Sequence, residues 1–167
     1  MLRVMAALVV ALMASAADAK PPLASLQGDV TVLAFWATSC APCRKELPRL
    51  EALRKSLAAD AKVRVVAVSI DLPGDEERAR KMARELGLKG TLVVDQDVYE
   101  EVFGYTDEAS VPRLAVIDRK RAGLQRIGAR AGETRDDFVR EVTAAVSSVE
   151  AGAPAPPTPM WQLLGRK

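Results

Sequence analysis

Two cysteines separated by two residues are the part of this sequence whose spacing could support covalent chemistry. Cys40 and Cys43 are the only cysteines of the 167-residue chain, which contains no histidine. A thiolate can attack a disulfide sulfur, and a second nearby thiol can resolve the mixed disulfide that forms. The pair therefore indicates thiol–disulfide exchange. The lack of histidine excludes Ser–His and Cys–His nucleophile pairs and His-ligated zinc.

The segments beside the cysteines predict how the pair is positioned. Val30 to Ala37 is an unbroken apolar run of strand length, as expected for a strand buried on both faces. Leucines at helical spacing follow it: Leu47, Leu50, Leu53 and Leu57. We expect Cys40 at the first turn of this helix, where unpaired N–H groups and the macrodipole lower a thiol pKa. Cys43 would then be shielded one turn inside.

Two other interpretations of the cysteine pair stay open. A purely structural disulfide would stabilise the fold little, because a two-residue spacing closes almost no loop in the unfolded chain. A metal site with two thiolates and no histidine would need further ligands from a second molecule. Redox chemistry is the interpretation that best suits a CxxC motif next to a strand–helix–strand pattern.

The rest of the chain alternates between strand and helix patterns. After the first strand and helix come a strand, an amphipathic helix and a short strand, at Val63–Ile70, Asp75–Leu86 and Thr91–Val94. Two further strands, Leu114–Asp118 and Leu124–Ala129, flank a hairpin loop. Thr134 caps a last helix together with Asp137. Parallel strands joined by helices and completed by an antiparallel pair predict a three-layer α/β/α sandwich with a mixed central sheet.

The two ends of the chain differ from its middle. Residues 1–19 have one arginine, an apolar run too short to cross a membrane, and small residues before Lys20, which predicts a secretory signal peptide cleaved near Ala19. We therefore expect an exported, periplasmic protein, with an N-terminal membrane anchor as the alternative. Residues 20–149 are expected to form one domain, and residues 150–167 a Pro-rich, disordered tail.

Two parts of the sequence resemble a known family. The segment from Phe35 to Pro48, with its Phe-Trp-Ala, CxPC, basic residue and Glu-x-Pro, resembles the active-site segment of the thioredoxin superfamily. The match is closest to its exported TlpA/ResA-like thiol–disulfide oxidoreductases. Val111-Pro112 before a strand resembles the cis-proline segment of the same proteins. The resemblance extends from about residue 29 to about 149, and it implies a thioredoxin-like fold.

The resemblance implies a role for each matching residue. Cys40 would be the attacking thiolate, Cys43 the resolving thiol, and Glu46 a carboxylate that exchanges a proton with a cysteine. Trp36, Val111 and Pro112 would belong to the substrate-binding site. If the bond before Pro112 is cis, it would place the Val111 backbone beside the disulfide, where it could pair with an extended substrate segment.

Several residues depart from the family pattern. Ser39 replaces a tryptophan that usually precedes the first cysteine, and Ala34 stands where relatives have a buried Asp or Asn. Arg113 follows Pro112 where threonine is more usual. Together with Arg44 and Lys45 it is expected to make the approach to Cys40 positive and to favour acidic partners. The segment between Gly104 and Pro112 is longer than in the family, and the N-terminal hairpin of the exported members is missing.

These observations predict a periplasmic thiol–disulfide oxidoreductase that reduces disulfides of partner proteins. It would use no cofactor besides its own disulfide, would act as a monomer, and would receive electrons from a membrane thiol reductase. A formal net charge of +2 argues against a nucleic-acid partner. The alternatives are a peroxiredoxin-like peroxidase, whose Pro-x-x-x-Thr/Ser-x-x-Cys motif is absent before Cys40, and a non-catalytic metal-binding or interaction module.

Overall fold

The computed structural model describes residues 23–104, 110–119, 123–127 and 134–152. The predicted signal peptide, nearly all of the predicted tail, most of the segment between Gly104 and Pro112, and the centre of the hairpin loop lie outside the described residues. The expected domain boundaries at residues 19 and 150 therefore stay predictions. In the described part of the chain, no helix is both long and apolar enough to cross a membrane.

The fold is built on a five-stranded mixed sheet with the strand order β3-β2-β1-β4-β5. The three strands β1 (Val30–Trp36), β2 (Val63–Ser69) and β3 (Thr91–Val94) are parallel to one another. The remaining two, β4 (Arg113–Asp118) and β5 (Gly123–Ile127), run antiparallel and form the hairpin. The predicted mixed sheet is thus confirmed, and so is its antiparallel end.

The central strand β1 determines where the cysteines lie. It pairs along its length with β2 on one side and β4 on the other. Six of its seven residues are buried, which explains why its sequence is a continuous apolar run instead of an alternating one. At its carboxyl end, Phe35 faces Arg113 of β4 and Trp36 faces Ser69 of β2, so three segments of the chain meet where the cysteines follow.

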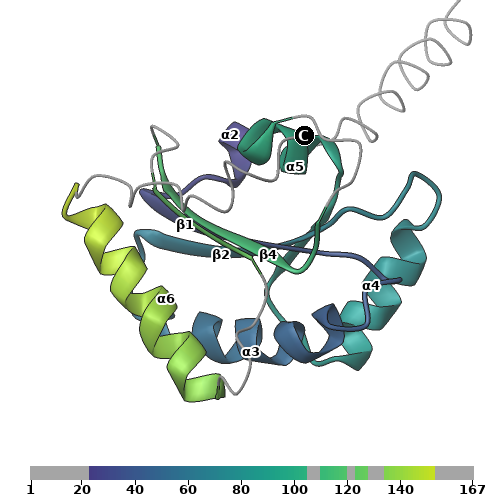
Figure 1. The fold of residues 1–167 in the computed structure, drawn as a ribbon, viewed down its shortest axis with the longest axis horizontal. Coiled ribbons are helices and arrows are strands. Elements are labelled where there is room, and N and C mark those ends of the chain that lie inside the picture. The colour runs from purple at the N-terminus through teal and green to yellow at the C-terminus, as the bar shows by residue number, and fades with distance from the viewer. Residues whose placement is uncertain (1–22, 105–109, 120–122, 128–133, 153–167) are drawn as a thin grey trace, which may run out of the picture.

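Helices cover both faces of the sheet and complete the predicted three layers (Figure 1). The long helices α3 (Cys43–Ser56), α4 (Glu76–Glu85) and α6 (Arg135–Glu150) lie on one face. The short helices α2 (Leu23–Leu26) and α5 (Asp97–Phe103) lie on the other. Each face has its own apolar core, because alternate strand residues point to opposite sides.

The two cores divide the buried side chains by sheet face. On the α3 side, the helices contribute buried residues that meet Trp36 and Val116 of the strands: Leu47, Leu50, Leu53, Ala79, Ala83, Phe138, Val142 and Val146. On the α5 side, Phe35 and Val68 of the strands meet the buried residues of the short helices: Leu23, Leu26, Val98 and Tyr99. Helix α3, which begins at Cys43, therefore belongs to the larger of the two helical layers.

The sequence-based expectations hold for the long elements and for the short strand β3, and they miss the two short helices. The capping box at Thr134 and Asp137 is present, and α6 begins directly after it. Neither α2 nor α5 was expected. With four and seven residues, both are too short to display a helical repeat, and their apolar residues are what hold them on the sheet.

Candidate active site

Cys40 and Cys43 form a disulfide directly after the central strand, at the start of α3. Their sulfurs are 2.02 Å apart. Cys43 is the first residue of α3 and is fully buried, whereas Cys40 lies in the preceding turn and is partly exposed. Only Cys40 can therefore meet a protein-sized partner in this state. The attacking role of Cys40 and the resolving role of Cys43 stay predictions.

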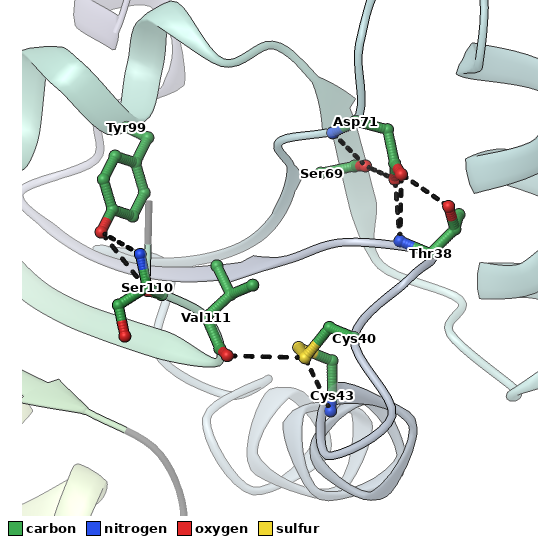
Figure 2. The surroundings of a disulfide bond; sticks show 8 residues. All are labelled: Thr38, Cys40, Cys43, Ser69, Asp71, Tyr99, Ser110 and Val111. Atoms are coloured by element: carbon green, nitrogen blue, oxygen red, sulfur yellow. Dashed lines mark hydrogen bonds between the residues drawn. A yellow bond between two sulfur atoms is a disulfide. The ribbon is translucent and has the colours of Figure 1, made fainter. Parts of the chain in front are cut away.

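The backbone of Cys43 contacts the other sulfur of the pair. Its N–H donates a hydrogen bond of 3.2 Å to Cys40 Sγ (Figure 2). The prediction that Cys40 occupies the first turn needs a correction, because the helix begins at Cys43 and its N-cap is Pro42. The physical argument survives, since the Cys43 amide is one of the unpaired N–H groups at the helix start.

The segment before β4 approaches the disulfide from the opposite side. The Val111–Pro112 peptide bond is cis, as expected. The carbonyl oxygen of Val111 lies 3.6 Å from Cys40 Sγ (Figure 2). Val111 and Pro112 are both partly exposed. Cys40 Sγ thus lies between a helix amide and the backbone carbonyl of a partly exposed residue.

A buried carboxylate fixes the loop that leads to Cys40. Asp71 accepts hydrogen bonds from the backbone N–H of Thr38, at 3.0 and 3.1 Å, and from the Thr38 hydroxyl at 2.5 Å. The Ser69 hydroxyl donates to the same carboxylate. Asp71 and Thr38 are 8% and 5% exposed. The sequence interpretation missed this group, although an aspartate just beyond a buried parallel strand is a recognisable signal.

A tyrosine of α5 binds the segment that precedes Val111. The backbone N–H of Ser110 donates to the Tyr99 hydroxyl at 3.1 Å, and that hydroxyl lies 3.3 Å from the Ser110 carbonyl oxygen (Figure 2). Tyr99 is 1% exposed and belongs to a helix that the sequence patterns did not predict. It is the second functional candidate that sequence reasoning missed.

Glu46 lies one turn beyond Cys43 at the edge of an apolar pocket. The pocket is small, with a cavity volume of about 30 Å³, and Trp36, Pro112 and Phe138 also line it. The carboxylate is 16% exposed, and Arg49 lies 3.4 Å from it. Ala34 lines the same pocket. Glu46 is therefore on the side of the sheet where the buried Cys43 lies, and its proton-exchange role stays a prediction.

Trp36 does not have the position expected of a substrate contact. Its side chain is 2% exposed and packs in the same core as Cys43 and Leu47. Its indole N–H has no hydrogen-bond partner among the described residues. In this conformation the Trp36 ring is part of the core that includes Cys43, and it is too buried to contact a partner protein.

The three basic residues expected near Cys40 are arranged differently from one another. Arg44 and Lys45 are exposed on the first turn of α3. The guanidinium of Arg113 instead lies 3.6 Å from the centre of the Phe103 ring and donates to the Tyr99 hydroxyl at 3.0 Å. Two positive charges are therefore exposed at the start of α3, while Arg113 contacts side chains of α5, and the acidic partner stays a prediction.

A metal site finds no support in the described part of the chain. There, no group of three or more His, Cys, Asp or Glu side chains is placed to hold a metal ion. The chemistry that the arrangement can perform is that of two sulfurs, one exposed and one buried, with a nearby carboxylate.

Comparison with known proteins identifies a family and individual relatives of this chain. The model of the AhpC/TSA family matches residues 10–122. The thioredoxin-like protein YneN of Bacillus subtilis is 36% identical over 102 residues, which are 60% of this chain and 57% of YneN. The chain thus spans little more than half the length of YneN. The thiol–disulfide oxidoreductase ResA of Bacillus thuringiensis is 23% identical over 74% of this chain and 69% of its own.

Solved structures confirm the fold. A putative thiol:disulfide interchange protein DsbE from Chlorobium tepidum superimposes with a TM-score of 0.58 and 26% sequence identity, covering 74% of this chain and 84% of that one. The expected thioredoxin-like three-layer fold is therefore correct. ResA and the Chlorobium tepidum protein are both named as proteins of thiol–disulfide exchange.

Proposed function

The chain belongs to the AhpC/TSA family of thioredoxin-like proteins, and we propose that it reduces disulfides of partner proteins outside the cytoplasm. One observation carries the proposal: Cys40 is partly exposed, its Sγ accepts a hydrogen bond from a helix amide, and its disulfide partner Cys43 is buried. A solely structural disulfide would not need one accessible sulfur with a hydrogen bond from the helix start.

The proposed reaction transfers two electrons from the reduced cysteine pair to the partner. The Cys40 thiolate attacks one sulfur of the partner disulfide, a Cys40–partner bond forms, and the other partner sulfur leaves as a thiolate and takes a proton. Cys43, having lost its proton, attacks Cys40 Sγ and displaces the second partner sulfur. The partner gains two thiols, and the protein is left as the Cys40–Cys43 disulfide described here.

Two neighbours of the disulfide have proposed roles in these steps. Glu46, partly buried and one turn from Cys43, removes the proton of the resolving thiol. The Val111 carbonyl, 3.6 Å from Cys40 Sγ, accepts a hydrogen bond from the backbone of an extended partner segment. A backbone contact of this kind suits partners of varied sequence, because every residue except proline offers an N–H.

The proposed direction of electron transfer and the proposed compartment both rest on the sequence. The signal-peptide pattern of residues 1–19 supports export, and a membrane thiol reductase would then return electrons to the disulfide. Exported oxidants of this superfamily carry a large helical insertion and often a histidine within CxxC. This chain has no histidine and little room for such an insertion, so it resembles the oxidants less. We therefore assign it as a reductant of partner disulfides, acting as a monomer.

Insulin reduction tests the proposal. The purified protein, supplied with dithiothreitol, should accelerate reduction of the insulin disulfides, whereas the Cys40→Ser variant should not. The Cys43→Ser variant should accumulate a mixed disulfide with insulin through Cys40, visible by mass spectrometry. A parallel assay of hydrogen peroxide consumption addresses the peroxidase alternative.

The outcomes separate the candidate functions. Insulin reduction without peroxide consumption supports the proposal. Rapid peroxide consumption that leaves insulin intact would assign the chain to the peroxidases. A mixed disulfide that forms in the Cys40→Ser variant and not in the Cys43→Ser variant would reverse the assigned roles of the two sulfurs.

A further inference from the structure

The Tyr99 ring is fixed between the sheet and its own helix. It packs against Phe35 of β1 with ring centres 5.3 Å apart in an edge-on arrangement, and against Phe103 of α5 at 4.9 Å. Only 1% of Tyr99 is exposed. Aromatic pairs in this geometry hold a ring in one orientation. The position of the Tyr99 hydroxyl is therefore set by the core on the α5 side.

The Tyr99 hydroxyl has a partner for each of its donor and acceptor sites. It accepts from the Ser110 N–H at 3.1 Å and from the Arg113 guanidinium at 3.0 Å, and it donates to the Ser110 carbonyl at 3.3 Å. A phenol oxygen offers one donor and two acceptor sites. Both backbone groups of Ser110 are thus bound by one side-chain atom, which fixes the peptide unit that precedes Val111.

Arg113 holds the other side of the same segment. It follows Pro112, and its guanidinium stacks 3.6 Å from the Phe103 ring centre while binding the Tyr99 hydroxyl. The segment from Ser110 to Arg113 is therefore attached at both ends to α5. Between these attachments lies Val111, whose carbonyl oxygen is 3.6 Å from Cys40 Sγ (Figure 2).

We propose that Tyr99 is a positioning residue for polypeptide substrates: by holding Ser110 it keeps the Val111 carbonyl aligned beside Cys40 for backbone pairing with an extended partner. The inference rests on the proposed disulfide exchange and adds the residue that shapes its substrate site. A segment ordered in advance does not lose conformational freedom when a partner binds. Without the Tyr99 hydroxyl, the segment would lose conformational freedom on binding a polypeptide, and the affinity for the polypeptide would decrease. A small disulfide, which has no backbone to pair, would be unaffected.

The test compares Tyr99→Phe with Thr91→Val. Tyr99→Phe keeps the ring contacts and removes all three hydrogen bonds. Thr91→Val also removes one hydroxyl, from an exposed residue of the edge strand β3, away from the site. Both variants and the parent protein are assayed with insulin and with hydroxyethyl disulfide. We expect Tyr99→Phe to raise the KM for insulin about three- to tenfold, to change kcat less than twofold, and to leave hydroxyethyl disulfide reduction unchanged. Thr91→Val should match the parent.

An unchanged KM for insulin in Tyr99→Phe would overturn the inference. So would an equal loss with both substrates, because it would indicate a general structural role. Amide hydrogen exchange at Ser110 gives a second measurement that does not depend on activity. The Ser110 N–H should be protected in the parent protein and should exchange at least tenfold faster in Tyr99→Phe.

The two proposals fail in different ways. If the parent protein reduces neither insulin nor hydroxyethyl disulfide, the proposed function is wrong, whatever Tyr99 does. In that case the exchange rate at Ser110 still decides whether Tyr99 holds the segment. Rapid exchange in the parent protein, or equal rates in the parent and in Tyr99→Phe, would contradict the positioning role itself.

Discussion

The carboxylate of Asp71 binds both the backbone N–H and the hydroxyl of Thr38, at distances from 2.5 to 3.1 Å, two residues before Cys40. It joins the end of β2 to the turn that carries the reactive sulfur (Figure 2). The carboxylate also accepts from the Ser69 hydroxyl and, at 3.5 Å, from the Arg78 guanidinium, so four donors converge on one buried group. The turn is thereby held in one conformation although its next residue, Ser39, is exposed.

Replacing Asp71 with alanine should destabilise the fold and slow the exchange reaction. The Thr38 N–H and two hydroxyls would lose their acceptor in a buried place, at a cost of about 2–3 kcal/mol in the free energy of unfolding. Urea denaturation measures this value. Asp75→Ala is the matched control, because Asp75 is more exposed and also contacts Arg78. A change below about 0.5 kcal/mol in Asp71→Ala, or an equal change in the control, would contradict the buried network.

Replacing Glu46 with glutamine should slow the step in which Cys43 resolves the mixed disulfide. An amide cannot take the thiol proton, so kcat for insulin reduction should fall about tenfold or more, and the rate should depend more steeply on hydroxide concentration. The pH–rate profile measures both effects. Glu51→Gln, on the same helix but more than one turn further from Cys43, should keep the parent profile. Identical profiles for parent and Glu46→Gln would remove Glu46 from the mechanism.

Glu51 predicts a pH dependence of stability. Hydrogen bonds from Arg54, at 2.8 and 3.0 Å, hold the pKa of the Glu51 carboxyl below its usual 4.5, and the Lys89 N–H contributes at 3.1 Å. A lowered folded-state pKa stabilises the fold above about pH 4.5, and this contribution is lost as the pH falls through the lowered value.

The variant Glu51→Gln isolates this contribution. At pH 7 it should be less stable than the parent by about 1 kcal/mol, a modest value because Arg54 is one-third exposed. The difference should shrink as the pH falls below 4.5 through the lowered pKa of Glu51, as urea titrations at several pH values would show. Glu77→Gln serves as control, because Glu77 is 82% exposed and should change stability little at any pH. A constant difference across the range would contradict the lowered pKa.

The central architecture could be predicted because it follows from local patterns. The apolar run of β1 and the leucine spacing of α3 are visible in short windows, and so is the capping box at Thr134. The cysteine pair could be placed as well, since a CxxC between a buried strand and a helix has few other positions. The predicted start of α3 was too early, because Pro42 suits either the first turn of a helix or the N-cap position that it has here.

The two supports of the site were not predicted, because they depend on contacts between distant segments. Asp71 meets Thr38 across 33 residues, and only the parallel pairing of β1 with β2 brings them together. Tyr99 lies on a seven-residue helix without a clear repeat, and its partner is a backbone group that no sequence pattern marks. Trp36 was assigned to the substrate-binding site from the family motif, because a motif records a residue's identity and not its exposure.

The reduction potential of the disulfide tests the proposed direction of exchange. A reductant should have a potential more negative than about −200 mV, on the side of thioredoxin, whose value is about −270 mV. Equilibration with reduced and oxidised glutathione, followed by the fluorescence of the buried Trp36, would measure it. A value near about −120 mV, typical of a strong disulfide-forming oxidant, would reverse the direction.

The pKa of the Cys40 thiol is the most direct test of the central claim that a helix amide activates this sulfur. The Cys43→Ser variant leaves a single thiol and keeps the backbone N–H that lies 3.2 Å from Cys40 Sγ. Its thiolate absorbance, followed against pH, should have a midpoint at least one unit below the ordinary value of about 8.5. The same variant unfolded in urea should titrate near about 8.5. A folded-state midpoint at or above the unfolded one would contradict the account.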